Sequence, residues 1–459
     1  MAKKLFGDFE PISSKQWKQQ IQFELKGADY NETLIWNSPE DIKVKPFYHN
    51  DEARDSIRAP HRNKPFSNCQ DIFVHDVDKS AYRALDSIKR GAESIRFTVQ
   101  DQNIDITKLL HNLPLDGINI YFELNFLSAA FIESVSKFAS ENNIHIHILL
   151  DPVGHLAKQG NWMTSASKDN FDFINSLSAL KNISLLSIDS ALYQNAGGTI
   201  VQQLAYSLSH ANEYLNRITN IGQPFTFKVA IGSNYFFEIA KLRALRLLFS
   251  LIAKEYGHTK ECHIIAVPSK RNKTLYDYNV NMLRTTTECM SAILGGADAV
   301  SNMPYDALYH KSNEFGERIS RNQLLILKHE SYLDKVANAP DGSYYIENLT
   351  QQLAEKALAL FKEIEANGGF LYQLGEGTIQ RKINESAENE QQLFDNGQET
   401  LLGTNKHPNL SDRMAHEMEL FPFVKITPRK TLIKPIIEKR LSEKMEQTRL
   451  AEEKSVGKS

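Results

Sequence analysis

Polar side chains follow the apolar runs of this chain at the places where a parallel sheet would carry chemistry. We expect strands at residues 95–99, 118–124, 144–150, 185–189, 225–231, 262–267 and 299–303. In barrels of alternating strands and helices, reactions take place at the carboxyl ends of the strands. The residues at those ends are Asp101, Asn125, Asp151, Asp189, Ser233, Asn234, Ser269 and Asn302. Their spacing forms no recognisable acid–base pair. Polar residues also end strands and cap helices, and we favour that structural interpretation.

Two histidines form the one arrangement that is typical of a metal site. His145 and His147 stand two residues apart in an expected strand, so their side chains face the same way. The spacing of the sequence places no third Cys, His or carboxylate ligand beside them. We therefore expect packed histidines rather than a metal centre.

Other chemical motifs are missing from the sequence, and its composition excludes several classes of protein. Neither the GxxxxGK[ST] loop nor the GxGxxG turn occurs, so nucleotide binding of those kinds is unsupported. A net charge of −3 suggests no attraction to nucleic acid or to an anionic membrane. No apolar run is long enough for a membrane span. Cys69, Cys262 and Cys289 are widely spaced, which indicates reduced, packed thiols in a cytoplasmic protein.

Helical patterns separate the expected strands, and this alternation favours parallel pairing. An eighth strand near residues 337–345 would close a (β/α)8 TIM barrel. A final helix is expected at 348–367, where Asn348 and Gln351 form a capping box and Gly368 ends the helix. The fold class is therefore α/β, a (β/α)8 barrel with an N-terminal arm and a C-terminal helical extension.

We expect three parts in the chain. Residues 1–71 form an N-terminal arm, with a helix at 17–25, a short strand at 34–36 and many aromatic side chains. The arm packs either on its own barrel or on a partner. The barrel spans 72–375. Residues 376–459 form an extension with a charged tail. In it we expect a polar loop at 376–405, a short helix within 407–423 and a solvated helix after 432.

One asparagine interrupts an apolar stripe in the helix expected around residues 315–327. Phe315, Ile319, Ile326 and Leu327 recur there at a helical period, and Asn322 falls among them. A buried polar residue must be hydrogen-bonded. We therefore expect Asn322 to be buried and bonded to backbone of the barrel wall.

Several motifs resemble those of the acyl-CoA mutases that depend on adenosylcobalamin, of which methylmalonyl-CoA mutase is the best known. The resemblance runs from about residue 5 to about 430, and it is greatest to the small (β) subunit of the heterodimeric bacterial enzyme. The motifs are Leu283-Arg284-Thr285 with Gly295-Gly296-Ala297, Glu317-Arg318-Ile319-Ser320-Arg321-Asn322-Gln323, Asp341-Gly342-Ser343-Tyr344-Tyr345, and the run from Asn234 to Arg243.

Residues that the family uses in catalysis are replaced in this chain. The resemblance implies a histidine at the position of Leu192, where it would contact the substrate thioester. A His-Ser-Gln loop is replaced by residues 266–274, and a substrate tyrosine motif by residues 68–73. A leucine cannot donate a hydrogen bond to a thioester oxygen. We therefore expect no catalytic residue and a degenerate active site.

The family's lower-ligand motif for cobalamin, Asp-x-His-x-x-Gly, does not occur in this sequence, and Asp151-Pro-Val-Gly-His155 resembles it only superficially. The resemblance thus implies a small, non-catalytic subunit without cofactor. Its partner would be a catalytic large (α) subunit that holds adenosylcobalamin and interconverts methylmalonyl-CoA and succinyl-CoA. Two alternatives remain: a stand-alone mutase barrel that borrows a separate cobalamin-binding protein, and a non-catalytic scaffold that binds acyl-CoA.

Overall fold

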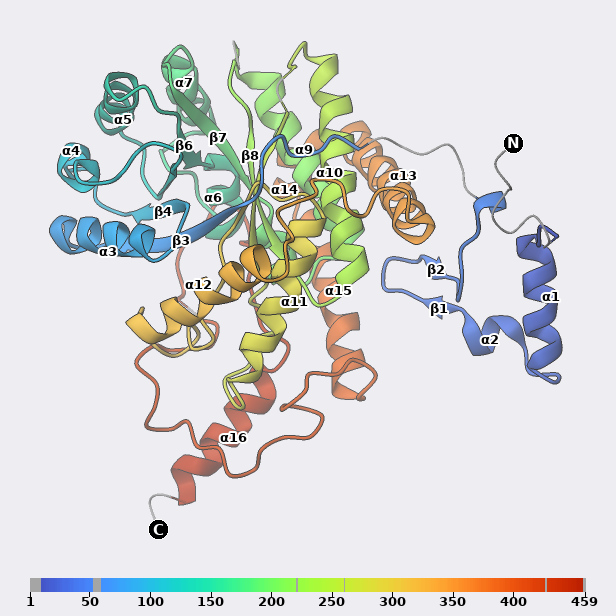
Figure 1. Ribbon diagram of the computed structural model, residues 1–459. Coiled ribbons are helices and arrows are strands. Elements are labelled where there is room, and N and C mark those ends of the chain that lie inside the picture. The colour runs from blue at the N-terminus through green and yellow to red at the C-terminus, as the bar shows by residue number, and fades with distance from the viewer. Residues whose placement is uncertain (1–9, 53–58, 220–221, 260, 426, 457–459) are drawn as a thin grey trace.

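The computed structural model describes residues 10–52, 59–219, 222–259, 261–425 and 427–456. A closed barrel of eight strands lies at its centre (Figure 1). All neighbouring strands pair in parallel, and the last pairs with the first. The strands are β3 Ser67–Val74, β4 Ser94–Val99, β5 Asn119–Leu124, β6 Ile146–Leu150, β7 Ile183–Asp189, β8 Thr226–Ile231, β9 His263–Pro268 and β10 Ala299–Val300. The expected (β/α)8 fold is therefore confirmed.

The location predicted for the eighth strand is wrong. Residues 337–343 form turns, since Pro340 lacks an amide donor and Gly342 has a left-handed backbone (φ 78°). The missing strand is instead β3, at the start of the barrel. The limit expected between arm and barrel, residue 71, falls inside this strand.

Helices cover the outside of the barrel and bury its apolar faces in one large core. They are α3 Val77–Lys89, α4 Ile106–Leu110, α5 Ala129–Glu141, α6 Pro152–Gln159, α7 Ser167–Leu177, α8 Ala191–Asn195, α9 Ile200–Arg217, α10 Tyr235–Glu255, α11 Val280–Leu294 and α12 Glu314–His329. The three cysteines are free and buried, as expected. Within the described ranges no helix is long and apolar enough to cross a membrane.

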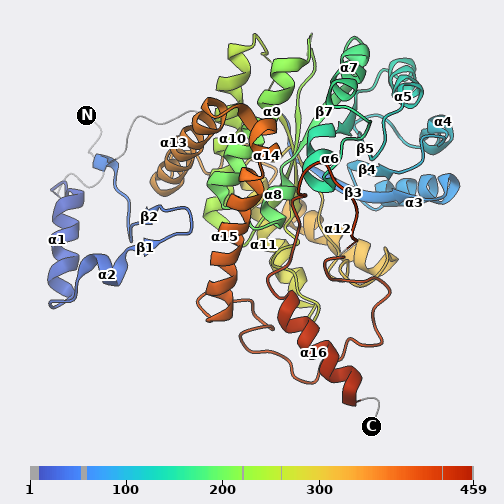
Figure 2. The same cartoon turned by 180° about the vertical axis from the view of Figure 1, so that it is seen from behind.

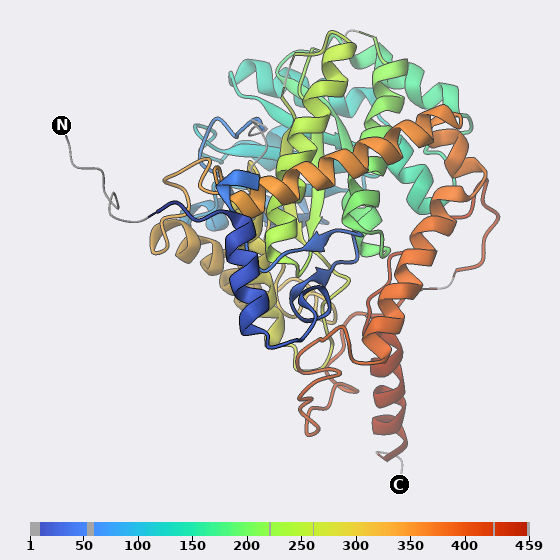
Figure 3. The same ribbon diagram turned by 90° about the vertical axis from the view of Figure 1, so that its right-hand side faces the viewer.

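The N-terminal arm projects from one side of the barrel (Figures 1 and 3). It contains α1 Ser14–Glu24, α2 Tyr30–Leu34, the hairpin of β1 Trp36–Asn37 and β2 Lys43–Val44, and a 3-10 turn at Asn50–Glu52. The strand expected at 34–36 is thus shorter than predicted, because Leu34 still belongs to α2. The hairpin fastens the arm: the Glu40 carboxylate accepts hydrogen bonds from the amides of Ile200 and Val201 at 2.7 and 2.8 Å, at the start of α9.

The C-terminal region is more ordered than the sequence suggested. Helices α13 Tyr344–Ala366, α14 Gly369–Gly375 and α15 Thr378–Asp395 follow the barrel. The prediction of a capping box at Asn348 is wrong, because α13 begins earlier, with Ser343 as its N-cap. The loop predicted at 376–405 is also wrong over the length of α15, whose Ile379 and Ile383 are buried one helical turn apart. No helix lies within 407–423.

The last described residues form a segment without regular structure and a helix. Residues 429–442 run without helix or strand from the barrel towards α16 Glu443–Val456, so the solvated helix expected from 432 begins eleven residues later. Figure 2 shows this segment rising from α16 to α6. Backbone amides of Leu432 and Ile436 donate to carbonyls of Gly160 and Ala157 on α6. We call residues 429–442 the strap.

The expected burial of Asn322 is wrong. Asn322 lies exposed on α12, and the side chains of Phe315 and Ile326 beside it are 51% and 46% exposed. Phe315 and Ile326 therefore face outwards, whereas Leu327 is buried in the core. The neighbouring Gln323 faces inwards instead and donates to the Met282 carbonyl at 2.6 Å on α11.

Candidate functional site at the mouth of the barrel

The carboxyl ends of the strands meet at the mouth of the barrel, and only some of the predicted residues come together there. Asp189 and Asn302 line the larger of two cavities, and Asn125, Asp151 and Asp189 line the smaller. Asp101, Ser233, Asn234 and Ser269 line neither of these two cavities. Asn234 is the N-cap position of α10, and the Ser269 hydroxyl donates to Asn195, which agrees with the structural interpretation.

Five charged side chains cross the floor of the mouth in a row that we call the charge ladder: Asp71, Arg96, Glu123, Lys228 and Asp189. Arg96 donates from Nε to Asp71 at 2.9 Å, and Lys228 Nζ lies 2.5 Å from Glu123 and 2.9 Å from Asp189. Of these five residues, only Asp189 was predicted from the sequence as a site residue. The signal that could have identified Arg96, Glu123 and Lys228 is a single charge inside an otherwise apolar strand.

Burial and charge oppose each other in the ladder. Burial alone would raise the pKa of Glu123, but the ammonium of Lys228 and the guanidinium of Arg96 lower it to about 2. Burial would likewise lower the pKa of Lys228, but Asp189 and Glu123 raise it. Glu123 and Lys228 are therefore both ionised at neutral pH, and neither is poised to act as a general acid or base near pH 7.

Aromatic rings fill the axis of the barrel beneath the ladder. The rings of His147 and His263 stack 4.3 Å apart, and the Tyr121 ring stacks on His147 at 5.1 Å. The Tyr121 hydroxyl lies 3.0 Å from Nε2 of His263. Tyr121 also belongs to a buried cluster with Cys69, Leu149, Ile265 and Ala299. The axis is thus a packed core rather than a channel.

The two histidines considered as metal ligands have other partners. His147 Nδ1 lies 3.3 Å from the Thr226 hydroxyl, and His145 Nε2 lies 2.8 Å from that of Ser184. In the part of the chain that the structure describes, no group of three His, Cys, Asp or Glu side chains could hold a metal ion. Burial lowers the pKa of His147 well below its usual value, so the ring is neutral at physiological pH.

Leu192 lies in α8, just beyond the end of β7, and its side chain is only 1% exposed within the apolar core. The adjacent Tyr193 hydroxyl lies 2.9 Å from Nδ1 of His210, whose Nε2 lies 2.8 Å from Asp151. Leu192 is thus packed in the apolar core, and His210, which contacts the adjacent Tyr193, is bonded to Asp151.

Asp151 is the centre of a buried hydrogen-bond network. Besides His210, its carboxylate accepts from the Tyr214 hydroxyl at 2.7 Å and from the amides of Gly154 and Asp189, both at 2.8 Å. Burial would raise the pKa of Asp151, but His210 and these donors lower it. The Asp151–His155 segment therefore caps α6 and joins β6 to α9.

Residues 266–274 comprise the end of β9 and the loop that follows it, and a buried ion pair locks this loop. Lys273 Nζ lies 2.8 Å from both carboxylate oxygens of Glu288 on α11, and it also bonds to Asn272 and to the Ser269 carbonyl. Both side chains of the pair are 1% exposed. A fully desolvated pair of this kind holds a loop in one conformation.

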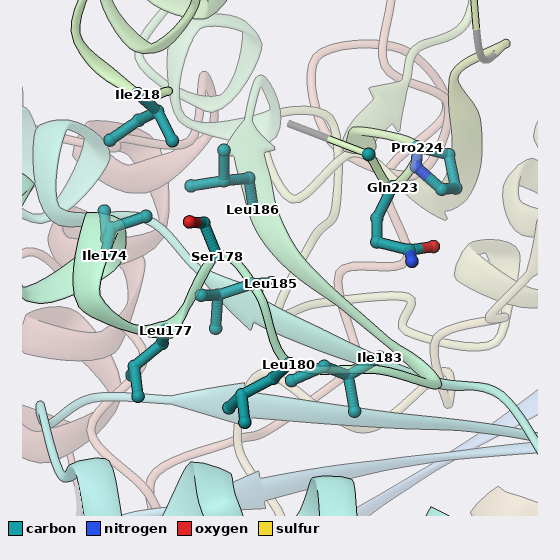
Figure 4. A pocket seen from close by; sticks show the side chains of 11 residues that line it. Ile174, Leu177, Ser178, Leu180, Ile183, Leu185, Leu186, Ile218, Gln223 and Pro224 are labelled. Atoms are coloured by element: carbon teal, nitrogen blue, oxygen red, sulfur yellow. The ribbon is translucent and has the colours of Figure 1, made fainter. Parts of the chain in front are cut away.

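Two cavities open at the mouth, with volumes of about 720 and 420 Å³. They share Glu123, Lys158, Asp189 and Lys228. The strap closes one side, where Glu438 pairs with Lys158 at 2.8 Å and bonds to Asn195 at 2.9 Å. A third, apolar pocket lies between α7 and β7 (Figure 4), but its 30 Å³ hold no more than about one water.

Comparison with known proteins agrees with the resemblance. A family model described as methylmalonyl-CoA mutase matches residues 97–452. The methylmalonyl-CoA mutase small subunit of Porphyromonas gingivalis is 32% identical, and the alignment covers 98% of this chain and 79% of the relative. The methylmalonyl-CoA mutase of Rhizobium meliloti is 28% identical over 86% of this chain and 64% of its own length. The small subunit of Streptomyces virginiae is 27% identical over 89% and 72%.

The fold and the site together define a closed α/β barrel with a packed axis and a charged mouth. The family model matches more than half of this chain, so the chain belongs to the methylmalonyl-CoA mutase family. Its similarity extends to the small subunits of that family.

Proposed function

We propose that this chain is the non-catalytic small subunit of a heterodimeric methylmalonyl-CoA mutase in the cytoplasm. The complete isomerase would interconvert methylmalonyl-CoA and succinyl-CoA by a radical route. A catalytic large (α) subunit would hold adenosylcobalamin, and this chain would stabilise and orient that subunit. The relatives that are named small subunits support this assignment.

The observation that carries the proposal is the closed axis of the barrel, beneath a mouth whose floor is held in ion pairs. An acyl-CoA must bring its thioester to residues that polarise it. Here the Tyr121, His147 and His263 rings fill the axis, and Leu192 is buried where the family has a histidine. The charge ladder above neutralises itself in ion pairs. These residues leave no open path for a thioester through the barrel.

The residues of this chain do not fit cobalamin. Asp151 is already saturated by His210, Tyr214 and two backbone amides, and the strap closes one side of the mouth. His155 lies in the first turn of α6, four residues after Asp151, whereas the family motif places its histidine two residues after the aspartate. We therefore assign the cofactor to the partner and derive no step through it here.

The arm supports the proposal of a partner. Trp17 and Phe23 on α1 are 51% and 80% exposed, and Trp36 is 48% exposed despite its contact with Phe237. Phe6 and Phe9 lie outside the described residues. Large aromatic side chains are enriched at protein interfaces, because they bury much area. We expect the arm to contribute to an interface of about 2,000 Å² or more with the large subunit.

Co-expression with the large subunit tests this function. We expect the two chains to co-purify, mutase activity to belong to the complex, and the isolated small subunit to have none. If the isolated chain is active once a separate cobalamin-binding protein is added, it is a stand-alone barrel. If it binds acyl-CoA but forms no complex, it is a scaffold.

A further inference from the structure

The larger cavity at the mouth is unused in the function proposed above. Its volume of about 720 Å³ lies within the range of small-molecule sites. The charge ladder forms its floor, and residues 420–425 together with 438–440 of the strap form part of its wall. This chain's own C-terminal region therefore forms part of the wall, and the barrel and its loops form the rest.

The lining of this cavity favours an anion. Nine Arg and Lys residues line it against seven Asp and Glu residues, although the whole chain has a net charge of −3. Lys270 and Lys439 are exposed at the edge beside the strap, and Lys311 and Lys425 lie on other parts of the lining. The acidic residues of the floor are already paired with Arg96 and Lys228.

The guanidinium of Arg96 provides a buried hydrogen-bond donor at this cavity. Arg96 is 8% exposed, its Nε and Nη2 bond to Asp71, and its Nη1 has no hydrogen-bond partner among the described residues. Burying such a donor unpaired is costly. A guanidinium matches a carboxylate in planar geometry, so a small organic acid is the ligand that satisfies it.

The cavity also has acceptors and an apolar wall. Oδ1 of Asp189 and Oδ1 of Asn302 are buried and lack a donor within the described part of the chain. A hydroxyl group on the ligand would supply one. Phe421, Met303 and Leu308 add apolar surface that fits a short carbon chain.

We infer that the mouth of the barrel binds a small aliphatic hydroxy acid as the free acid, through Arg96, the strap lysines and an acceptor of the floor. The packed axis beneath leaves no route for a CoA moiety through the barrel. This inference stands on the cavity alone and does not depend on whether the chain is a mutase subunit.

Calorimetric titration of the full-length chain tests the site. The probes are 3-hydroxybutyrate, butyrate, butyramide and inorganic phosphate, each up to about 10 mM, which detects affinities near the millimolar range. We expect 3-hydroxybutyrate to bind tightest and butyramide at least about tenfold more weakly than butyrate, because one charge-assisted hydrogen bond is lost. Equal binding of butyramide and butyrate, or no binding of either acid, would overturn the inference. Binding of phosphate alone would mean that the cavity is a phosphate site rather than a carboxylate site, and it would also overturn the inference.

Substitutions of lining residues test whether the acid binds in this cavity. Arg96→Met should weaken 3-hydroxybutyrate about tenfold or more, and Lys439→Gln should weaken it by a smaller factor. Lys434→Gln is the matched control, since Lys434 is an exposed lysine of the same strap that does not line the cavity. If Arg96→Met does not fold, Lys439→Gln and Lys434→Gln still decide the question. Equal effects of these two variants would contradict a site at the mouth.

Discussion

The imidazole rings of His147 and His263 stack face to face, 4.3 Å apart, across the axis of the barrel. His147 comes from β6 and His263 from β9, so the contact joins strands on different sides of the closed sheet. Such a stack is stable only while the rings are neutral. It closes the space through which a substrate would otherwise extend.

This stack predicts that the protein loses stability in mild acid. Burial lowers the pKa of both rings, and the charge that His263 would carry lowers the pKa of His147 further. Their stabilising contribution is thus complete above the unfolded pKa of about 6.5 and is lost as pH falls below it. The expected loss at pH 5.5 is about 1.4 kcal/mol per ring that stays neutral in the folded state.

Urea unfolding at pH 8, 6.5 and 5.5 measures this loss. His147→Phe keeps an aromatic ring and removes one titration, so the decline between pH 6.5 and 5.5 should become smaller. Asp298 and Arg246 lie near His263, and both stay ionised throughout this interval. An unchanged decline in the variant would show that His147 is not responsible.

Leu192→His tests whether a single polar group restores the site. We expect no turnover by the isolated variant, because catalytic groups act as a unit and the 266–274 loop is also altered. The imidazole would enter an apolar core, so stability should fall by about 2–4 kcal/mol. Leu192→Met, which conserves volume, should cost less than about 1.5 kcal/mol. Methylmalonyl-CoA turnover by the histidine variant alone would mean that the site is nearly intact.

Asn322 and Gln323 should respond differently to removal of their amides. Asn322 is exposed, so Asn322→Leu should change the free energy of unfolding by no more than about 0.5 kcal/mol. Gln323 bonds to Met282, Thr285 and Thr286, so Gln323→Leu should cost about 1–3 kcal/mol. Thermal denaturation of both variants gives the comparison, and a larger loss for Asn322 would restore the buried assignment made from the sequence.

We expect substitutions in the arm to weaken assembly with the large subunit without changing the folding of this chain. Trp17→Ala combined with Phe23→Ala should weaken co-purification with the large subunit, because both rings are exposed on α1. Tyr372→Ala on α14, also an exposed aromatic, is the matched control. The melting temperature of the isolated chain should be the same in all three proteins. If the double variant still forms a full-affinity complex, the interface lies elsewhere.

The barrel could be predicted from the sequence because most of its strands are largely apolar and alternate with helical patterns. β3 was missed as a barrel strand because Asn68, Gln70 and Asp71 interrupt its apolar run, and those polar side chains belong to the helix contacts and the mouth. Helix α15 was missed because it is mostly polar and buries only a narrow stripe.

The candidate site could be predicted only in part. The family motifs pointed to Leu192 and to residues 266–274, and both lie buried near the mouth. The charge ladder and the His147–His263 stack join residues that are far apart in the sequence. Periodicity within one element carries no information on such contacts, so they required the closed barrel.

The isolated chain should bind no cobalamin. Asp151 is fully bonded, and the strap closes one side of the mouth, so Asp151 is not free to support a lower ligand. Equilibrium dialysis with adenosylcobalamin measures this directly, with the co-purified complex as the positive control. Stoichiometric micromolar binding by the small subunit alone would refute the assignment of the cofactor to the partner.

The most direct test of the central claim is a mutase assay on three samples: this chain, the large subunit, and their complex, each supplied with adenosylcobalamin and methylmalonyl-CoA. We expect succinyl-CoA formation by the complex and none by this chain. We also expect Leu192→Met to leave the rate of the complex unchanged, since Leu192 is buried in the core. Succinyl-CoA formation by this chain alone would contradict the claim that its barrel is non-catalytic.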